Sequence, residues 1–236
     1  MTIDTAVLLA AGEGTRLRDM AAVKPLCMVA GRPLIDRALM GLATAGMTRA
    51  VVVVGYERAL IERHLASRDW PLSVEIVTTD HLLPNGVSAR AASAVVGEAD
   101  VLLAMCDHLV EPALYARVAA AGAGDGLRLG IDRRLDHDWV DPEDVTRVRT
   151  ERDRIVALGK GIDDYDAHDT GVFAVGRTLF AALAGLDDPS LTEGVRVLAA
   201  RGQAEVVDCT GLAWLDVDDA PALAKAEAWM RARGDA

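Results

Sequence analysis

The feature that constrains the fold most is a series of short, continuously apolar runs separated by longer amphipathic stretches. In the first half of the chain these runs are TAVLLA (5–10), AVVVVG (50–55), SVEIV (73–77) and DVLLAM (100–105). Runs of this length without polar alternation are typical of strands that are buried on both faces, as in a parallel sheet. We therefore expect each run to form a buried strand.

The stretches between these runs have the spacing of helices. The candidates are 34–46, 57–67 and 111–122, and the first and the last end at a glycine, which favours a helix C-terminus. Strand–helix–strand repetition predicts right-handed βαβ units. The first half is therefore expected to form a Rossmann-like, doubly wound α/β sheet.

The second half has a different pattern, because its strand candidates are joined by short polar connections that favour antiparallel pairing. These strands are 127–131, 144–150, 154–159, 170–176 and 204–209. Helices are expected over 178–186, 191–202 and 219–234, the last capped by Asp219 with Pro221 in its first turn. We predict a mostly parallel sheet with an antiparallel portion, in one domain over 1–236 whose halves are about 1–125 and 126–236.

Composition narrows the classes of partner. The chain has 236 residues, of which 51% are hydrophobic, so it can bury a sizeable core, and its net charge is −11. A strongly acidic chain is repelled by phosphate polyanions, which argues against nucleic acid and anionic membranes. A small phosphorylated ligand needs only a local cationic pocket, and we expect small-molecule partners.

The compartment is predicted from the cysteines and from the N-terminus. Cys27, Cys106 and Cys209 are scattered and lack metal-ligand spacing, so they are interpreted as thiols in a reducing cytoplasm. The first apolar run is interrupted by Gly12 and Glu13, and no basic segment precedes it. The N-terminus therefore predicts neither a signal peptide nor a membrane span.

A glycine-rich segment, LAAGEGTRL (9–17), begins at the end of the first predicted strand. In open α/β sheets ligands bind outside the carboxyl ends of the strands, where backbone N–H groups can hold a polyphosphate. The dinucleotide fingerprint is excluded because its third glycine is replaced by Leu17. The P-loop is excluded because the Gly-Lys pair at Lys160 is followed by glycine and not by serine or threonine.

Together with KPL (24–26), this segment closely resembles the signature of nucleotidyltransferases that join a nucleoside triphosphate to a sugar phosphate or polyol phosphate. The resemblance implies that the first half binds the nucleotide and the second half the acceptor substrate. It also implies that Arg16 and Lys24 bind the phosphates. The loop residues that it assigns to the nucleotide are Ala10, Ala11, Gly12, Glu13, Gly14 and Thr15.

Nucleotidyl transfer requires Mg²⁺, which prefers carboxylates and phosphate oxygens as ligands. Asp107 follows the run at 100–105, and Asp216 lies in WLDVD (214–218) after the last predicted strand. Either aspartate alone would be an ordinary turn residue at a strand end. Both match carboxylate positions of the family, so we predict that they form the metal pair, with Asp218 as an alternative or neighbouring ligand.

The expected chemistry needs no general base. A phosphomonoester has a second pKa of about 6, so its oxygen is already largely anionic at neutral pH and can attack the α-phosphorus in line. The enzyme must neutralise charge and align the two substrates. Lys160, in ALGKGI, is the candidate cation for the phosphate of the acceptor, although a lysine at a strand end is otherwise a solvated charge.

The resemblance is closest to CTP:inositol-1-phosphate cytidylyltransferases. HLLPNGVSA (81–89), MCDHLV, LGKGI, HDTGVF and WLDVD follow that branch in order and spacing. The reaction implied is cytidylyl transfer from CTP to inositol 1-phosphate, which gives CDP-inositol and pyrophosphate. Asn85 and Gly86 would contact the cytosine, and Ser88 and Asp107 are also predicted to bind the nucleotide. The predicted acceptor residues are His108, Lys160, Asp169, Thr170 and Gly171.

Some residues differ from the sequence pattern of the inositol-phosphate branch, and others are given no role in the predicted site. Cys106 stands where the branch has glycine, and it would narrow the site. The acidic segment 132–144 is expected to be a solvated loop, with Arg133 and Arg134 outside the site. His137 and His168 lack the spacing of zinc ligands.

Two alternatives stay open. One is a cytidylyl- or uridylyltransferase that acts on phosphocholine, a phosphonate or a hexose 1-phosphate. The other, from a different class, is an inactive nucleotide-binding regulator, which should have lost Arg16, Lys24 or a metal aspartate; all of these are present. The sequence predicts no membrane insertion and leaves open whether the chain forms a homodimer.

Overall fold

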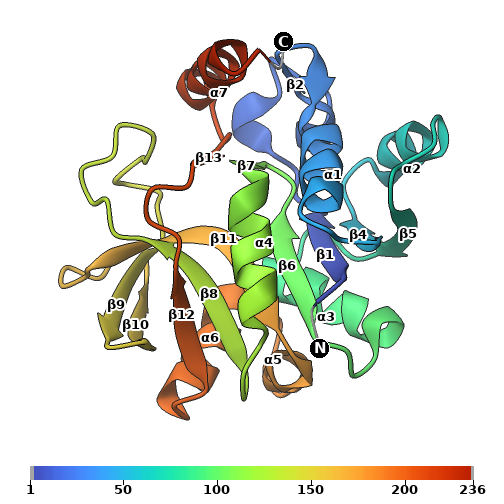
Figure 1. Cartoon of the computed structure of the whole chain (residues 1–236). Coiled ribbons are helices and arrows are strands. Elements are labelled where there is room, and N and C mark those ends of the chain that lie inside the picture. The colour runs from blue at the N-terminus through green and yellow to red at the C-terminus, as the bar shows by residue number, and fades with distance from the viewer. Residues whose placement is uncertain (1–2, 235–236) are drawn as a thin grey trace.

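The structure is a computed structural model that describes residues 3–234; residues 1–2 and 235–236, the ends of the predicted 1–236 domain, lie outside the described residues. Its centre is a mixed sheet of nine strands with helices on both faces (Figure 1). Across the sheet the strands are, in order, β5 (Ser73–Thr78), β4 (Arg49–Val54), β1 (Thr5–Ala10), β6 (Val101–Met105), β11 (Ala167–Val175), β8 (Leu127–Asp132), β12 (Ala204–Asp208), β10 (Arg154–Gly159) and β9 (Arg147–Glu151).

The predicted doubly wound, parallel portion is confirmed in the first half. Strands β5, β4, β1 and β6 are all parallel, and Leu8 on β1 lies between Val52 on β4 and Ala104 on β6. These central residues are fully buried, as expected for strands covered on both faces. The carboxyl ends of β1 and β6 therefore lie side by side.

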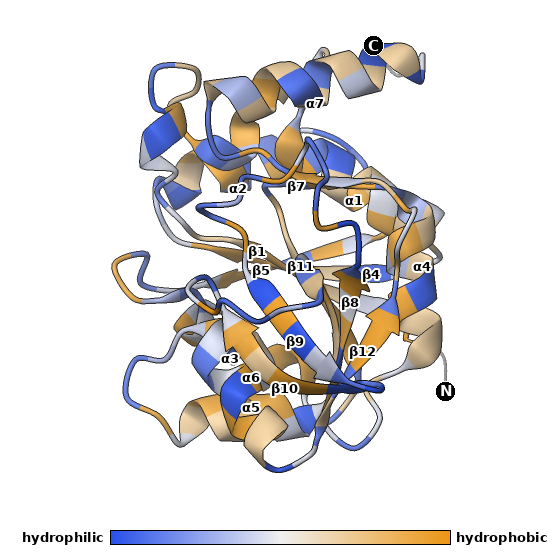
Figure 2. Cartoon of the chain, turned by 90° about the vertical axis from the view of Figure 1, so that its left-hand side faces the viewer, coloured by the Kyte–Doolittle hydropathy of each residue, from blue (hydrophilic) through white to orange (hydrophobic). Residues whose placement is uncertain are grey.

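The second half is mainly antiparallel, also as predicted. Strand β11 pairs antiparallel with β6, β8 and β9, while β10 pairs antiparallel with β9 and β12. The pair β8–β12 is parallel, so the whole sheet is mixed. Strand β9, which pairs with both β10 and the start of β11, alternates hydrophilic and hydrophobic residues (Figure 2), and this matches its alternating burial.

The strand predicted over 144–150 begins later, at Arg147. The preceding residues form a turn instead, in which the carbonyl of Asp141 accepts hydrogen bonds from the backbone N–H groups of Asp144 and Val145, at 3.2 and 2.9 Å. Pro142 favours such a turn because its ring fixes the backbone. Asp144 therefore lies on a turn and not within the sheet.

Seven helices have bounds within the described residues: α1 (Leu34–Thr44), α2 (Arg58–Ala66), α3 (Asn85–Val96), α4 (Pro112–Ala121), α5 (Arg177–Ala184), α6 (Leu191–Ala200) and α7 (Ala220–Ala232). Helices α1, α2 and α4 cover one face of the sheet, and α3, α5 and α6 cover the other. The side chain of Asp219 caps α7, as predicted, by accepting a 2.8 Å hydrogen bond from Ala222 N. Helix α3 was not predicted, because its segment was interpreted only as a recognition loop.

Two short antiparallel pairs lie outside the main sheet: β2 (Met28–Val29) with β3 (Arg32–Pro33), and β7 (His108–Val110) with β13 (Trp214–Asp216). They form a third hydrophobic cluster with α7, in which Leu109 and Leu215 are buried. The β7–β13 pair places His108 opposite Asp216. Within residues 3–234, none of the helices combines the length and apolar composition that a membrane crossing needs.

Candidate active site

The glycine-rich segment leaves β1 and passes through two short 3₁₀ helices, η1 (Thr15–Leu17) and η2 (Lys24–Leu26). Gly14 has φ of +62°, in the left-handed region, and a Cβ atom added there would overlap the Cβ of Lys24. Glycine is therefore required both by the backbone and by close packing. Because residue 14 has no side chain, Lys24 can lie directly against the loop.

The Lys24 side chain connects the loop to three aspartates. It is only 8% exposed, and its Nζ lies 2.6 Å from Oδ2 of Asp107 and 3.9 Å from Oδ1 of Asp216; it also forms an ion pair with Asp218. Burial alone would lower the pKa of Lys24, but the three carboxylates together raise it above its ordinary value. Lys24 is therefore a permanent cation at the centre of the site.

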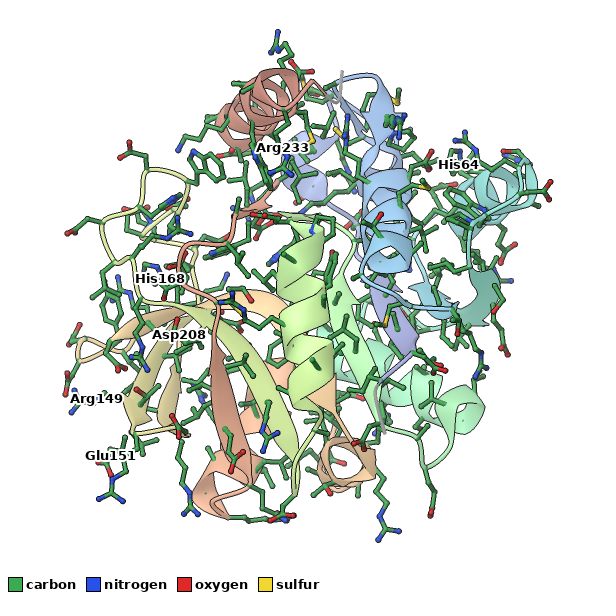
Figure 3. All side chains as sticks on the ribbon, in the orientation of Figure 1. His64, Arg149, Glu151, His168, Asp208 and Arg233 are labelled. Atoms are coloured by element: carbon green, nitrogen blue, oxygen red, sulfur yellow. The ribbon has the colours of Figure 1, made fainter. Side chains whose placement is uncertain are left out.

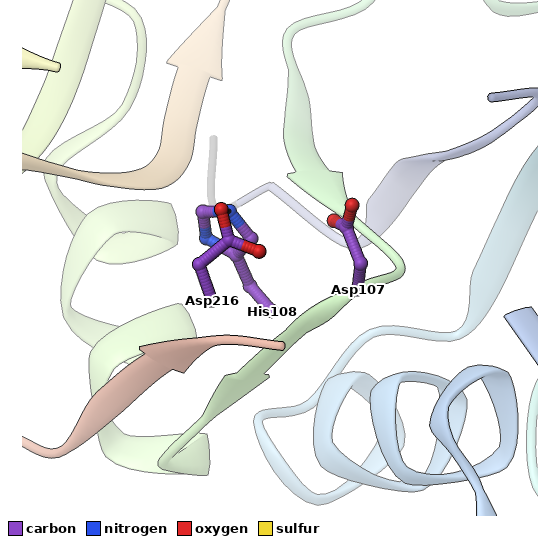
Figure 4. Close-up of side chains that lie close together, drawn as sticks. All are labelled: Asp107, His108 and Asp216. Carbon is purple, nitrogen blue, oxygen red and sulfur yellow. Dashed lines mark ion pairs between the residues drawn. The ribbon is translucent and has the colours of Figure 1, made fainter. Parts of the chain in front are cut away.

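His108 and Asp216 lie side by side on β7 and β13, with Asp107 facing them (Figure 4). Nε2 of His108 is 3.5 Å from Oδ2 of Asp216, and its Nδ1 donates a 3.0 Å hydrogen bond to the carbonyl of Thr170. Burial acts to lower the pKa of His108, but Asp216 and Asp107 raise it to about 10. The imidazole is therefore protonated at neutral pH and cannot act as a general base.

Gly171 is the second glycine that the site requires. It has φ of +75°, and an added Cβ would overlap the imidazole of His108. The predicted DTG segment therefore gives His108 its space and its carbonyl partner, while the side chain of Thr170 points elsewhere and donates a 2.8 Å hydrogen bond to the carbonyl of Gly130.

The carboxylates are arranged as a divalent metal would require. Ligand atoms of Asp107, His108 and Asp216 lie within 4.8 Å of one another, and so do those of Asp144, Asp216 and Asp218. Oδ1 of Asp216 is buried and accepts no hydrogen bond from residues 3–234, which leaves a ligand oxygen without a donor. Carboxylate oxygens are the protein ligands that Mg²⁺ prefers, so the donor set fits this ion.

Two cavities meet at these residues. The smaller, of about 260 Å³, lies against the glycine-rich loop and is lined by Ala10, Gly12, Gly14, Thr15, Arg16, Lys24, Cys106, Asp107 and Asp218, among others. The larger, of about 480 Å³, reaches across to β10, β11 and α6. Arg16, Asp107 and Asp218 line both cavities and stand at their junction, whereas Lys24 lines only the smaller cavity and Asp216 only the larger one.

Lys160, the predicted cation for the acceptor phosphate, lines the larger cavity. Its Nζ forms an ion pair with Asp144, and the second oxygen of Asp144 lies 2.7 Å from Nη2 of Arg16. Burial acts to raise the pKa of Asp144, but hydrogen bonds from Lys160 and Arg16 lower it well below its usual range. Arg16 also pairs with Asp218.

These contacts correct the prediction that the acidic segment 132–144 is simply a solvated loop. Asp144 enters the site at one end of the segment, and Asp132 is fully buried at the other. The carboxylate of Asp132 accepts hydrogen bonds from Arg134 and, at 2.9 Å, from Nε1 of Trp214. The acidic pattern of the segment did not reveal this, because one donor to the buried Asp132, Trp214, comes from a distant part of the sequence.

Trp214, which donates to this buried carboxylate, lies two residues before Asp216 on β13. Its ring stacks on His108, with ring centroids 6.3 Å apart and an interplanar angle of 27°. The contact supports two residues of the carboxylate cluster from one side. Trp139, in the same acidic segment, lines the larger cavity and packs on Trp229 of α7, with centroids 5.0 Å apart.

Asp169 lines the larger cavity at the start of the DTG segment. Its Oδ1 accepts a 2.7 Å hydrogen bond from the backbone N–H of Gly171. Burial raises the pKa of Asp169 to about 6, and the hydrogen bond from Gly171 only partly opposes this effect. The carboxylate therefore faces the predicted acceptor site and is ionised only near neutral pH and above.

Asn85 lies at the start of α3 and lines the larger cavity, not the smaller one. Its Oδ1 accepts a 2.8 Å hydrogen bond from the backbone N–H of Leu191, so its Nδ2 group is left as a donor. Gly86 lies under α6, because an added Cβ would overlap the backbone at Pro189 and Ser190. The close packing of α3 against the start of α6 thus explains this glycine without a role in base recognition.

The structure brings most of the predicted site residues together but not all of them. Five of them line neither cavity: Ala11, Glu13, Gly86, Ser88 and Thr170. Glu13 instead forms an ion pair with Arg18 on the exposed side of the loop.

The cysteines are free thiols, as predicted, and His137 and His168 lie outside the carboxylate cluster. The groups of candidate metal ligands found within residues 3–234 include neither His137 nor His168, and Figure 3 shows His168 on the strand below the acidic segment. Cys27, Cys106 and Cys209 are free and buried. Burial raises the pKa of the Cys106 thiol well above its ordinary value, so Cys106 narrows the smaller cavity as a neutral group.

Comparisons with known proteins agree with this geometry. The family model of the MobA-like NTP transferase domain matches residues 6–137, more than half of the chain. The chain is 34% identical over 218 residues to the bifunctional IPC transferase and DIPP synthase of Rubrobacter xylanophilus, which covers 90% of this chain and 49% of that protein. The protein of the same name from Aquifex aeolicus is 30% identical over 241 residues, covering 97% of this chain and 52% of that protein. The chain thus spans about half the length of these curated relatives.

The solved structure of the inositol-1-phosphate CTP transferase from T. maritima is similar over almost the whole chain. It superposes with a TM-score of 0.87 at 26% identity, covering 98% of this chain and 96% of that one. This likeness confirms the predicted nucleotidyltransferase fold. The matched family model, which includes the glycine-rich loop, Lys24 and Asp107, shows that the chain belongs to the MobA-like NTP transferase domain family.

Proposed function

We propose that the chain transfers a cytidylyl group from CTP to inositol 1-phosphate, which gives CDP-inositol and pyrophosphate. The observation that carries the proposal is the position of Lys24, between the glycine-rich loop and the aspartates Asp107, Asp216 and Asp218. A buried cation beside a carboxylate cluster, at the junction of two cavities, is the arrangement that a triphosphate and a phosphorylated acceptor need to meet.

The nucleotide is assigned to the smaller cavity and the junction. Gly12, Gly14 and Thr15 line this cavity, so the triphosphate can approach their backbone closely. Arg16 and Lys24 would bind its phosphates at the junction. The base of the nucleotide is assigned to the part of the larger cavity beside α3, where the Nδ2 group of Asn85 can donate to an acceptor on cytosine.

The acceptor is assigned to the larger cavity. Lys160 offers a cation for its phosphate, and Asp169 offers a carboxylate for a hydroxyl group. Cationic His108 lies between them and the carboxylate cluster. A polyol phosphate, which combines an anionic phosphate with several hydroxyl groups, suits this combination of side chains.

Mg²⁺ would be held by Asp107 and Asp216, with Asp218 beside them. When bound, this ion supplies positive charge that offsets the charge on the reacting phosphates. Lys24 balances the same carboxylates and keeps the cluster assembled at the junction.

The reaction needs only alignment and charge balance from the protein. An anionic phosphate oxygen of the acceptor attacks the α-phosphorus of CTP, the bond from that phosphorus to the bridging oxygen breaks, and pyrophosphate leaves with the electron pair. Arg16 and Lys24 neutralise the leaving group, and Lys160 holds the attacking phosphate. His108 is already protonated and takes no proton from the nucleophile.

The comparisons support the choice of substrates. The similar solved structure is described as an inositol-1-phosphate CTP transferase, and the curated relatives are named IPC transferases and DIPP synthases. The similarity covers only about half of those relatives, so the proposal is restricted to the transferase activity.

The test is a pyrophosphate-release assay with Mg²⁺ in which ATP, CTP, GTP and UTP are each combined with four acceptors: inositol 1-phosphate, phosphocholine, a 2-aminoalkylphosphonate and glucose 1-phosphate. Release with CTP and inositol 1-phosphate, confirmed by the mass of CDP-inositol, is the expected result. Release with CTP and another acceptor would overturn the acceptor assignment and keep the nucleotide. Nucleotide binding without release from any combination would favour the inactive regulator.

A further inference from the structure

The side chain of Asp144 joins the two cations that are assigned to different substrates. One of its oxygens lies 2.7 Å from Nη2 of Arg16, at the nucleotide side, and the other pairs with Nζ of Lys160, at the acceptor side. Arg16 comes from the glycine-rich loop and Lys160 from the end of β10, so the contact spans the cavity.

Asp144 itself is held on a fixed turn. Its backbone N–H and that of Val145 donate to the carbonyl of Asp141, and the side chain of Asp141 accepts a 2.9 Å hydrogen bond from Glu143 N. Two residues further on, the carbonyl of Thr146 accepts a 2.9 Å hydrogen bond from the backbone N–H of Asp169. The turn is therefore tied to the strand that lines the acceptor cavity.

The side chains of Arg16 and Lys160 are long and largely exposed, whereas that of Asp144 is mostly buried. The side chains of Arg16 and Lys160 are 52% and 58% exposed, and that of Asp144 is 25% exposed. Ion pairs with exposed partners contribute little to the free energy of unfolding. The structural benefit of this bridge is thus small, whereas the rotational freedom that it removes from two phosphate-binding side chains is large.

We propose that Asp144 is a positioning residue that holds Arg16 and Lys160 at a fixed separation, so that the two phosphates they bind meet in line. This inference rests on the proposed function for the identity of the two phosphates. Arg16 keeps N–H groups for a phosphate while one binds Asp144, because guanidinium carries five donors in a rigid fork. Lys160 likewise keeps two of its three donors.

The proposal predicts that kcat and KM respond differently to loss of the carboxylate. Asp144→Asn removes a negative charge that faces both phosphates, so the KM values for CTP and inositol 1-phosphate should stay within about twofold or fall. The two cations lose their common anchor, so kcat should fall at least about tenfold, as when a reacting pair is misaligned. A purely structural role would lower the melting temperature and raise both KM values.

Two further variants make the experiment specific. Asp144→Glu keeps the charge and should recover part of kcat. Glu143→Gln is the matched control, because Glu143 is the exposed neighbouring acid and does not line the cavity; it should leave kcat and KM unchanged. An unchanged kcat in Asp144→Asn, or KM values that rise while kcat is kept, would overturn the proposal.

A second readout does not depend on turnover. The ion pair with Asp144 engages Nζ of Lys160. Acetylation of Lys160 by an N-hydroxysuccinimide ester, followed by mass spectrometry, should therefore be several-fold faster in Asp144→Asn than in the wild type or in Glu143→Gln. Equal acetylation rates in the wild type and in Asp144→Asn would show that Asp144 does not hold Lys160 in solution. Slow acetylation in a wild-type protein that lacks turnover with every acceptor would refute the proposed function and leave the bridge standing.

Discussion

Lys24 Nζ lies 2.6 Å from Oδ2 of Asp107, and this ion pair joins the glycine-rich loop after β1 to the end of the neighbouring strand β6. The side chain of Lys24 is nearly buried, with only 8% of it exposed. Burial of a charged lysine destabilises the folded state unless the lysine forms ion pairs. Lys24 forms them with Asp107 and Asp218. The glycine-rich loop and the carboxylate cluster are therefore held together by one set of contacts.

Replacement of Asp107 by asparagine tests its place in the carboxylate cluster. Asp107→Asn should reduce pyrophosphate release in the presence of Mg²⁺ by a factor of about 100 to 1000, because a charged ligand is lost where phosphate charge must be neutralised. Lys24 keeps Asp218 as a partner, so the far-ultraviolet circular dichroism should not change. Asp69→Asn, at an exposed position outside both cavities, is the control. Wild-type turnover by Asp107→Asn would exclude Asp107 as a metal ligand.

The glycine-rich loop offers a comparison of two glycines. Gly14→Ala should destabilise the protein by about 1–2 kcal/mol, because an alanine at φ of +62° is strained and its Cβ overlaps Lys24. Gly12→Ala meets no atom within 4 Å and should leave the melting temperature unchanged. Thermal unfolding of both variants measures this difference.

CTP titrations of the same two variants distinguish an effect on nucleotide binding from an effect on stability. Both should bind CTP more weakly, Gly14→Ala because the loop is displaced and Gly12→Ala because its methyl group enters the smaller cavity. Unchanged CTP binding by Gly12→Ala would mean that the triphosphate does not approach this part of the loop.

The pKa of Asp169 predicts a dependence of stability on pH. Its folded pKa of about 6 lies above the ordinary value of 3.8, so the folded state binds the proton more tightly than the unfolded state. This contribution to stability is complete below pH 3.8 and is lost as the pH rises through 6. The loss is at most about 3 kcal/mol, and less to the extent that cavity water reaches the carboxylate.

Asp169→Asn should therefore be more stable than the wild type at pH 8, and the difference should shrink toward pH 4. Asparagine keeps the acceptor for the Gly171 N–H but carries no charge to bury. Urea unfolding at several pH values measures the effect, while the KM for inositol 1-phosphate should rise. A stability difference that is the same at pH 4 and pH 8 would contradict the raised pKa.

The donor on Asn85 can be removed without disturbing its structural bond. In Asn85→Asp, one oxygen can still accept the hydrogen bond from Leu191 N, so the melting temperature should be kept. The Nδ2 donor is lost and a negative charge is added, so the KM for CTP should rise at least about tenfold, equivalent to about 1.4 kcal/mol. A higher KM for the acceptor, with no change for CTP, would assign Asn85 to the acceptor instead.

A comparison of two tryptophan variants distinguishes an effect on stability from an effect on activity. Trp214→Phe and Trp70→Phe each remove one indole hydrogen bond, to Asp132 and to the carbonyl of Leu65 respectively. Both should lose about 1–3 kcal/mol of stability, because a partner is left unsatisfied. Only Trp214→Phe should also lower kcat, since Trp214 stacks on His108 beside Asp216. Equal kcat values in the two variants would show that this stacking does not support the site.

The local patterns of the chain predicted much of the fold and of the site. Strands β1, β4, β5 and β6 were predicted because each is a short apolar run, and the glycine-rich loop, Lys24, Asp107 and Asp216 were predicted because their spacing is local or family-specific. Helix α3 was missed because the segment from Asn85 was interpreted by its resemblance alone.

What the sequence did not reveal depends on contacts between distant residues. Asp144 looked like one acid among several, and its role at the cavity follows from a turn that brings it to Arg16, far away in the chain. The buried Asp132 is explained by Trp214, which approaches from β13. A charge pattern alone cannot distinguish a solvated carboxylate from one whose donors arrive through tertiary packing.

The β7–β13 ladder has a consequence for how such a chain can diverge. It pairs His108 with Asp216 directly, outside the main sheet, so the spacing of these two residues does not depend on the length of the chain between them. Changes in the length of the chain between β7 and β13 leave this pairing intact, whereas Gly171 stays constrained because a side chain there would overlap His108. The carboxylate cluster can therefore keep its geometry over evolutionary time while the segments that connect these two strands change in length.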